Sequence, residues 1–422
     1  MDKKKIIIVL TCCVIGLYSH AQKKYDYQPL TKSQQADIDN MMLTREVSTF
    51  LVNDRIPIGP IDLTNVLNMI SDNPIEGTRI RISAETNNKM FASNKFLRNR
   101  LTLSAMAAYG IGDNNFKYSV GAAFNFAAKP SGVYSFPCST LSVQWEDNTY
   151  SPSYPNYDVA YFSFGSWERF YFASKRQLTL SFLQEFQNSL ALRPFFYWQQ
   201  IYSYVLYDAG NIIEFIDPDI DYINKAAGLE LSFSPSRKGL NVLNILNSRF
   251  YSLPTKFAMS YSYNLQSYQY DNNYHKLEAT AQHRFIFSPM ALDFKLTGGK
   301  IFGTSNRYMY FTPNYMSSAV SNTFGFNLYS PYEMMFKQYI QTFTQINFGG
   351  ILLDNIKFFK HFRPNEFVNF KALFTQNNDP YCEVGIGIDH IFALLGLEVI
   401  KRLSKENPYE MPQWAVRVRC NL

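Results

Sequence analysis

Charged residues are scarce in this sequence. Asp, Glu, Lys and Arg make up 18% of its 422 residues, whereas roughly 25% is usual in soluble domains. The 40 basic residues outnumber the 34 acidic ones only slightly, and no run of Lys or Arg lies beyond Lys3–Lys5. This weak and scattered positive charge disfavours nucleic acid as a partner.

Long apolar runs and paired cysteines are also missing. Beyond Leu17 no stretch reaches the roughly 18 consecutive apolar residues of a transmembrane helix. Two of the five cysteines, Cys12 and Cys13, lie in a short N-terminal apolar run, where a lipoprotein signal is a second interpretation. The other three, Cys138, Cys382 and Cys420, are too few and too far apart for a disulfide framework.

Aromatic residues, by contrast, are abundant. Phe, Trp and Tyr make up 17% of the chain, with 36 Phe and 30 Tyr. A chain with this much apolar surface to bury is not intrinsically disordered. It needs either a large core or an apolar surrounding.

The N-terminus has the pattern of a secretory signal peptide. Lys3–Lys5 precede the short apolar run Ile6–Leu17, and Ser19-His20-Ala21 supplies the small residues that a signal peptidase requires. We therefore predict that residues 1–21 are a signal peptide cleaved after Ala21, and that the protein is exported.

Residues 22–75 are predicted to form an N-terminal periplasmic segment. Thr31 and Gln34 fit a capping box, and the apolar spacing that follows predicts an amphipathic helix over residues 31–51. Prolines interrupt the chain after it. The helix would plug the periplasmic mouth of a barrel, dock a periplasmic or other envelope protein as a partner, or act as a simple tether.

From Thr78 onward the apolar residues recur with a period of two, which predicts β-strands. The clearest runs lie at 116–126, 257–265, 275–287, 340–348, 368–374, 382–389 and 414–422. With weaker runs the count is about fifteen, and because bacterial barrels normally have an even number, 14 or 16 strands are expected. Twelve would remain if the weaker runs were connections.

The two faces of these strands differ in an unusual way. The polar face is mostly Ser, Gly, Ala, Asn and Gln, whereas the apolar face has aromatic residues near both ends of a strand with smaller groups between. Residues 116–126 are the best example, and the predicted lipid-facing aromatic residues are Phe116, Tyr118, Phe124, Phe126 and Trp414. Aromatic rings favour the two interfaces of a membrane. We therefore predict one all-β domain over residues 76–422, a transmembrane antiparallel β-barrel in outer-membrane lipid that closes by pairing its last strand with its first. A soluble all-β fold is the alternative.

The sequence resembles an uncharacterised family of Gram-negative outer-membrane β-barrels that is usually fused behind a carboxypeptidase-regulatory-like domain. Seven segments carry the resemblance, in the family's order: Asn73–Arg79 with Thr86 and Asn87, Tyr109-Gly110 with Asp113, Lys117-Tyr118, Tyr274–Glu278, Gly299–Gly303, Asn327-Leu328 with Tyr332-Glu333, and Pro380–Gly387. The resemblance implies an outer-membrane β-barrel but no reaction or substrate. The chain departs from the family in that we expect no regulatory-like domain between the signal peptide and the barrel.

Charged residues on the polar face are the candidate functional residues. Glu383 and Asp389 share this face of one predicted strand, and Arg417 and Arg419 share it in the last strand, so all four are predicted to face the lumen. They would form a charged constriction, hold a plug, or make wall-stabilising ion pairs. A further pair, Glu76 and Arg79, at the start of the first strand, would anchor the seam or the inner mouth, or would be solvated charges in a turn.

Two connections are candidates for folding into the lumen or binding a partner. These are Tyr150–Tyr161, which is rich in Tyr, Pro and Ser, and Arg237–Phe250, which has helix-like apolar spacing. Plain surface loops are the alternative for both.

No catalytic or metal-binding motif stands out. The histidines after the signal peptide are scattered, and neither H-E-x-x-H nor G-x-S-x-G occurs. We therefore predict no enzyme activity, no metal and no cofactor. The favoured function is a passive pore or a transport or assembly component of the outer membrane. The alternatives are an outer-membrane lipid hydrolase or protease, and a non-conducting scaffold that binds envelope proteins.

Overall fold

A computed structural model describes residues 56–420 apart from several segments within that range. The segments outside the description are 64–68, 74–75, 127–137, 151–168, 187–188, 209–210, 216–221, 235–254, 266–272, 288–289, 315–319, 322, 330–334, 352, 354–355, 357–364, 377–378, 392–394 and 405–412. The predicted signal peptide, the predicted helix at 31–51, and nearly all of the two candidate loops therefore lie outside the described residues.

All twenty strands of the described chain belong to one sheet. The first half comprises β1 (Ile56–Ile58), β2 (Ile61–Leu63), β3 (Ile70–Asn73), β4 (Gly77–Thr86), β5 (Leu101–Gly110), β6 (Phe116–Asn125), β7 (Ser139–Tyr150), β8 (Arg169–Glu185), β9 (Leu190–Asp208) and β10 (Asn211–Phe215). The second half comprises β11 (Tyr222–Phe233), β12 (Lys256–Leu265), β13 (Tyr274–Phe287), β14 (Met290–Gly303), β15 (Val320–Ser321), β16 (Gln338–Asn347), β17 (Asn365–Thr375), β18 (Tyr381–Ile391), β19 (Leu395–Arg402) and β20 (Trp414–Cys420).

The long strands form an antiparallel meander. From β4 to β20 each long strand pairs with the next one along the chain, omitting the short β10 and β15. These are fifteen strands, and β2 and β3 together occupy a sixteenth position along the other edge of β4. The all-β antiparallel prediction is confirmed with 16 positions, and the lower count of 12 is wrong. The described residues contain a 3-10 helix, η2 (Arg307–Met309), but no α-helix.

The predicted closure of the barrel is not found in the described residues. No pairing joins β4 to β20. The second edge of β4 is already paired with β2 and β3, and β20 pairs in parallel with β15, where Val320 lies opposite Val418 and Ser321 opposite Arg419. Closure requires free backbone donors and acceptors on both edges, and here shorter pieces of the same chain occupy many of them.

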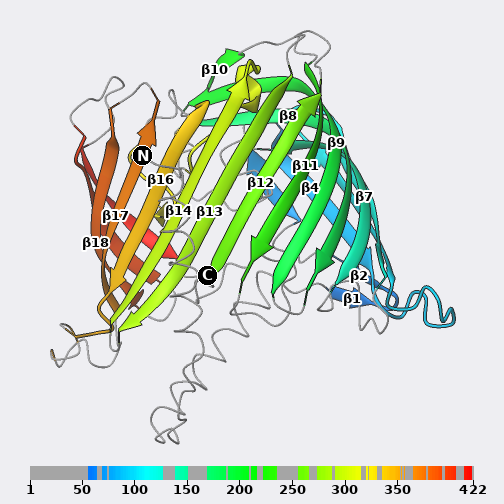
Figure 1. Ribbon diagram of the computed structural model, residues 1–422, viewed down its shortest axis with the longest axis horizontal. Helices are drawn as coiled ribbons and strands as arrows, with labels where there is room; N and C mark the ends of the chain where they lie inside the picture. The colour runs from blue at the N-terminus through cyan, green and yellow to red at the C-terminus, as the bar shows by residue number, and fades with distance from the viewer. Residues whose placement is uncertain are drawn as a thin grey trace, which may run out of the picture. The chain divides into compact units, whose positions relative to one another are not determined.

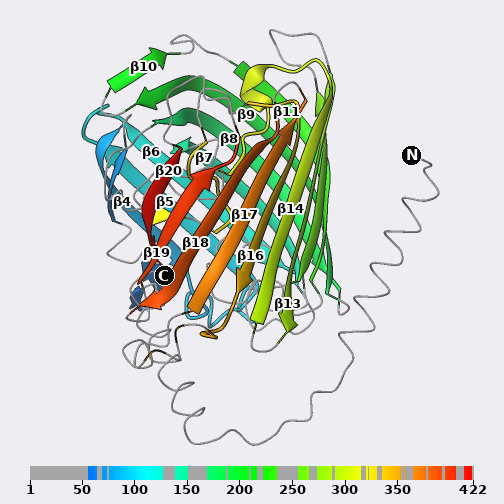
Figure 2. The same cartoon turned by 90° about the vertical axis from the view of Figure 1, so that its left-hand side faces the viewer.

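The strands lie side by side in a strongly curved sheet (Figures 1 and 2). We call the end at which β4, β6 and β8 begin the upper end, after its position in Figure 1, and the opposite end the lower end. The face on the inside of the curve is the inner face, and the other is the outer face.

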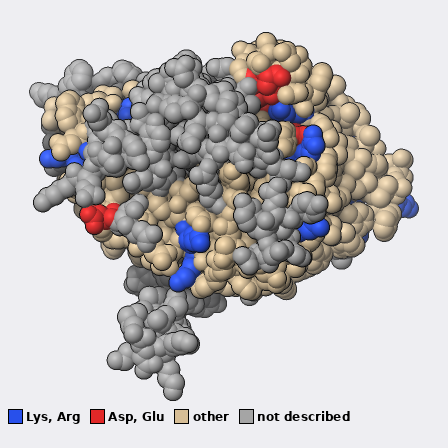
Figure 3. All heavy atoms as spheres, turned by 90° about the horizontal axis from the view of Figure 1, so that it is seen from above, with Lys and Arg blue, Asp and Glu red and all other residues tan. Residues whose placement is uncertain are grey.

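The polarity of the two faces is the reverse of that in a water-soluble protein. On β6, Phe116 is 73% exposed and Val120 is 51% exposed, whereas Lys117 between them is 3% exposed and Asn125 is fully buried. Because successive side chains of a strand point to opposite faces, the apolar residues lie on the outer face and the polar ones on the inner face. Figure 3, which looks onto the upper end, shows few charged atoms on the described surface in view.

Candidate functional site

The connection between β14 and β16 folds back along the inner face. We call the described parts of residues 304–337 the inward segment; they include η2 and β15. A β-bridge between Phe311 and Phe336 ties its two ends together. The segment contacts inner-face side chains of β11, β13, β14, β16, β17, β18 and β20, so it occupies the inner side of this half of the sheet.

Glu383 holds the middle of the inward segment. Its carboxylate, on β18, accepts hydrogen bonds from the backbone amides of Asn327 at 3.0 Å and Leu328 at 2.6 Å. Tyr381 donates a third from its hydroxyl at 2.6 Å. The Glu383 side chain is fully buried. A buried carboxylate needs such donors, because an ionised group without partners is costly in a low-dielectric interior.

Two basic side chains hold the neighbouring part of the segment. Lys371 Nζ on β17 donates to the Gly325 carbonyl at 2.8 Å. Arg419 on β20 donates to Thr323 Oγ1 and, at 2.8 Å, to Gln345 Oε1. Three strands therefore each supply a buried charged side chain to one stretch of the segment.

The start of the inward segment is bound to β13 and β16, which lie on the other side of this half of the sheet from β20. Lys276 Nζ on β13 donates to the Met309 carbonyl at 3.0 Å. Its ammonium also lies 4.4 Å from the centre of the Phe311 ring. Asn314 donates from its backbone amide to Gln341 Oε1 on β16 at 3.2 Å. The segment thus crosses the wall and is hydrogen-bonded along the way.

An aromatic core lies between the inward segment and the strands. The Phe326 ring lies 5.0 Å from Phe343 and 5.6 Å from Tyr381, and the Tyr329 ring lies 4.7 Å from Tyr381. Phe326 and Phe343 are fully buried. The inner face is therefore not uniformly small and polar, as the sequence had indicated. The inward segment brings its own apolar residues, which need apolar partners on the wall.

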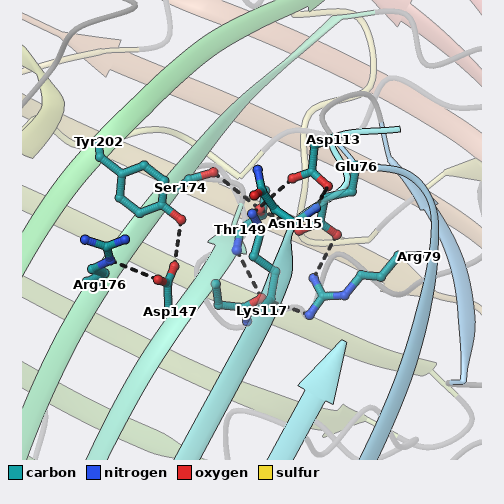
Figure 4. Close-up of polar contacts among 11 residues, drawn as sticks. Glu76, Arg79, Asp113, Asn115, Lys117, Asp147, Thr149, Ser174, Arg176 and Tyr202 are labelled. Atoms are coloured by element: carbon teal, nitrogen blue, oxygen red, sulfur yellow. Dashed lines mark hydrogen bonds and ion pairs between the residues drawn. The ribbon is translucent and has the colours of Figure 1, made fainter. Parts of the chain in front are cut away.

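A second polar network lies on the first strands (Figure 4). Glu76 and Arg79 are both fully buried, with Arg79 Nη1 3.3 Å from Glu76 Oε2. Thr149 on β7 donates to Glu76 Oε1 at 2.7 Å, and Arg79 donates to Asn148 Oδ1 at 2.9 Å. This burial excludes solvated turn charges. The pair ties the start of β4 to the end of β7.

Figure 4 also shows a separate group, made of Asp147, Arg176 and Tyr202. Arg176 Nε donates to Asp147 Oδ2 at 2.9 Å, and the Tyr202 hydroxyl donates to Asp147 Oδ1 at 2.6 Å. Arg176 is four residues before Leu180 on β8 and shares its face of the strand. Leu180 is 45% exposed, so Arg176 lies on the outer face.

The structure brings some of the predicted lumen charges together. Arg419 Nε lies 3.3 Å from Asp389 Oδ1, and both side chains are buried. Glu383 instead binds the inward segment, and Arg417 lies opposite Glu398 in the register of β19 and β20. Lys371 was not among the predicted lumen charges, although alternation with Phe370 and Ala372 puts it on the polar face. Nothing in the sequence pattern indicated that residues 304–337 fold inward.

The aromatic candidates lie on the outer face. Phe116, Tyr118, Phe126 and Trp414 are all exposed. Phe124 is half-buried, because its ring packs 4.9 Å from that of Phe126 and 5.6 Å from that of Phe96.

Within the described chain, no group of three or more His, Cys, Asp or Glu side chains could hold a metal ion. A search of the same residues for a long apolar helix that could span a membrane found none.

One part of the chain is similar to a family of unknown function. Residues 229–388 match the C-terminal domain of the family of unknown function DUF5686. This match runs from β11 into β18 and contains the inward segment. It does not extend to a regulatory-like domain. No curated protein matches the chain.

Two solved structures have a similar arrangement of the backbone. One is BamA from Haemophilus ducreyi lacking POTRA domains 1–3, with 9% identity, a TM-score of 0.49, and coverage of 90% of this chain and 78% of that one. The other is Wzi from Escherichia coli, a carbohydrate-binding β-barrel outer-membrane protein involved in group 1 capsule assembly. It has 10% identity, a TM-score of 0.32, and coverage of 93% and 88%. At these values neither similarity indicates a function.

Proposed function

We propose that this chain is an integral outer-membrane β-barrel protein that serves as a transport or assembly component, without catalytic chemistry of its own. The observation that carries the proposal is the reversed polarity of the sheet. Exposing Phe116, Val120 and Val416 to water while burying Lys117 and Lys371 would be unfavourable on both counts. In a bilayer the same arrangement is favourable, because lipid covers the apolar face.

Strand length supports the same proposal. A tilted strand needs about 9–11 residues to cross the hydrocarbon core, and most strands from β4 to β18 have at least 10 residues. The predicted signal peptide directs the chain to the envelope, where strand-built membrane proteins occupy the outer membrane.

The inward segment favours a regulated component over an open passive pore. It is hydrogen-bonded to β13, β16, β17, β18 and β20 and packs its aromatic residues against the wall. A solute passing along this half of the inner face would need the segment to move. A freely open pore does not require such a device.

The membrane assignment is tested by flotation and by cysteine labelling. Protein refolded with phosphatidylcholine vesicles should float with them in a density gradient. In a background lacking Cys138, Cys382 and Cys420, Val120→Cys and its inner-face neighbour Ser119→Cys are spin-labelled while unfolded and then refolded into the vesicles. Oxygen dissolved in the bilayer should relax the label at residue 120 more strongly than the label at residue 119. Failure to float, or equal relaxation of the two labels by oxygen, contradicts the proposal.

The role of the inward segment is tested by conductance in planar bilayers. The wild-type protein should show small or rare current steps. Glu383→Gln, which removes a carboxylate that holds the inward segment, should show larger and more frequent steps. Large, steady steps from the wild-type protein would support an open pore instead. If neither the wild-type protein nor the variant conducts, and the protein stably captures an envelope protein, the non-conducting scaffold would be supported.

A further inference from the structure

The outer face has a distinct distribution of positive charge. Where side chains are described, the outward strand positions carry four basic residues, and all of them are exposed: Arg176, Lys225, Lys300 and Lys401. Lys225 lies near the start of β11. Arg176 lies in the middle of the long strand β8, but the register places it level with Asp147 near the end of β7 and with Tyr118 near the start of β6. Lys300 and Lys401 lie near the ends of β14 and β19. In the meander all four places are at the upper end, and we call these residues the upper-end cations.

Each upper-end cation lies beside an aromatic ring. The Arg176 guanidinium is 5.2 Å from the Tyr202 ring centre, and Lys300 Nζ is 5.3 Å from that of Phe302. In the strand register Lys225 lies opposite Trp198, and Lys401 lies opposite Trp414. Aromatic rings prefer the interfacial region of a bilayer, and long basic side chains extend toward its headgroups.

The lower end lacks this combination. Its outward aromatic residues include Phe124, Phe126, Phe285 and Phe287. At the described strand positions there, no Lys or Arg accompanies them on the outer face. The two interfaces of the sheet therefore differ in charge as well as in aromatic type.

Arg176 and Lys225 are the two upper-end cations nearest each other in the strand order, and Asp147 on the same face offsets one of their two charges. They flank β9 on the same face, with Arg176 opposite Gln200 and Lys225 opposite Trp198. Neighbouring strands are about 4.8 Å apart, so two long side chains on either side of β9 can reach one small anion. Asp147 engages Nε of Arg176; among described residues the terminal guanidinium nitrogens have no hydrogen-bond acceptor, and no carboxylate pairs with Lys225.

We infer that the upper-end cations bind phosphate groups of lipids in the leaflet at that end, most strongly between Arg176 and Lys225. A guanidinium and an ammonium are the usual protein ligands of phosphate, and the nearby Trp198 and Tyr202 rings hold the site at the depth of the headgroups. The inference rests on the proposed membrane location.

The test uses phosphatidylglycerol as the probe lipid. The full-length protein is reconstituted in phosphatidylcholine bilayers with a minor fraction of spin-labelled phosphatidylglycerol, and the fraction bound at the protein surface is measured. The variant Arg176→Gln/Lys225→Gln is compared with Lys89→Gln/Lys95→Gln. The second pair is exposed in the connection after β4 at the lower end and changes the net charge by the same amount.

A surface cation contributes about fivefold to the binding of an anionic lipid. The upper-end variant should therefore lose roughly 25-fold in relative affinity, and the lower-end variant less than about twofold. Added salt should reduce the wild-type affinity toward that of the upper-end variant. Equal affinities in the two variants would overturn the inference, as would an equal loss measured with spin-labelled phosphatidylcholine. Failure of the wild-type protein to enter any bilayer would instead refute the membrane location and the inference with it.

Discussion

The Glu383 carboxylate on β18 accepts the backbone amide hydrogens of Asn327 and Leu328, which precede it by 56 and 55 residues. This contact joins the main chain of the inward segment to a side chain of the sheet. The middle of the segment is therefore held by one buried acidic group, beside the contacts that Lys371 and Arg419 make with the residues just before it.

Replacing Glu383 by Gln should loosen the inward segment. The side chain of Gln has one acceptor oxygen with two lone pairs, too few for the three donors that the carboxylate accepts, and its NH2 group would lie against the backbone N–H of Asn327. Each buried donor left unsatisfied costs about 1–3 kcal/mol. We expect larger and more frequent current steps in planar bilayers than for the wild-type protein. Glu146→Gln is the matched control, because Glu146 pairs with Lys175 at 2.8 Å and does not touch the segment. Unchanged conductance in Glu383→Gln would contradict this role.

Gly299 and Gly298 should differ sharply on replacement by Ala. A Cβ at Gly299 would lie 2.6 Å from Phe311 and 2.8 Å from Tyr339, whereas a Cβ at Gly298 would meet no atom closer than 3.4 Å. Gly299→Ala should displace Phe311 and make the inward segment more sensitive to protease, by about tenfold in cleavage rate for roughly 1.4 kcal/mol of lost packing. Gly298→Ala should resemble the wild type. Equal cleavage of the two variants would argue against this packing.

Breaking the buried pair Glu76 and Arg79 on one side should destabilise the barrel. Removing one partner of a buried ion pair typically costs about 3–5 kcal/mol, because the remaining charge is left uncompensated. Glu76→Gln should lower the temperature at which the protein loses its compact, heat-modifiable band in SDS gels. The double variant Glu76→Gln/Arg79→Gln should recover part of the loss. A double variant that is as unstable as the sum of the two single variants would show that the pair does not interact.

Basic substitutions on the outer face should be tolerated according to depth. An Arg or Lys at the bilayer midplane costs about 2–4 kcal/mol, and near an interface about 0–1 kcal/mol. Val120 lies in the middle of β6 and Phe116 at its upper end. Val120→Arg should therefore lower the unfolding free energy in phosphatidylcholine bilayers, measured by urea titration, and Phe116→Arg should change it little. Similar losses at both sites would conflict with a bilayer around this strand.

Local patterns were enough to predict the strands and their faces. The alternation of Phe116, Tyr118 and Val120 with Lys117 and Ser119 identified both the strand and its polar side. The same alternation would have identified Lys371 as an inner-face residue. These features depend on the two-residue period of a strand, which is visible in a short stretch of sequence.

The inward segment could not be predicted in the same way. Its anchors are Lys276, Lys371, Glu383 and Arg419. They lie on four different strands, and the local sequence around each one predicts only an ordinary polar-face residue. The pairing at the edges of the sheet could not be predicted either. Pairing of β15 with β20, and of β2 and β3 with β4, involves strands of two to four residues, too short to leave a periodic pattern.

The sequence by itself determined that this protein is built of antiparallel strands with an apolar outer face, because that information lies in the period of neighbouring residues. The tertiary structure alone decided which connection turns inward, which buried charges hold it, and which edges remain unjoined, because those outcomes depend on contacts between residues that are dozens of positions apart.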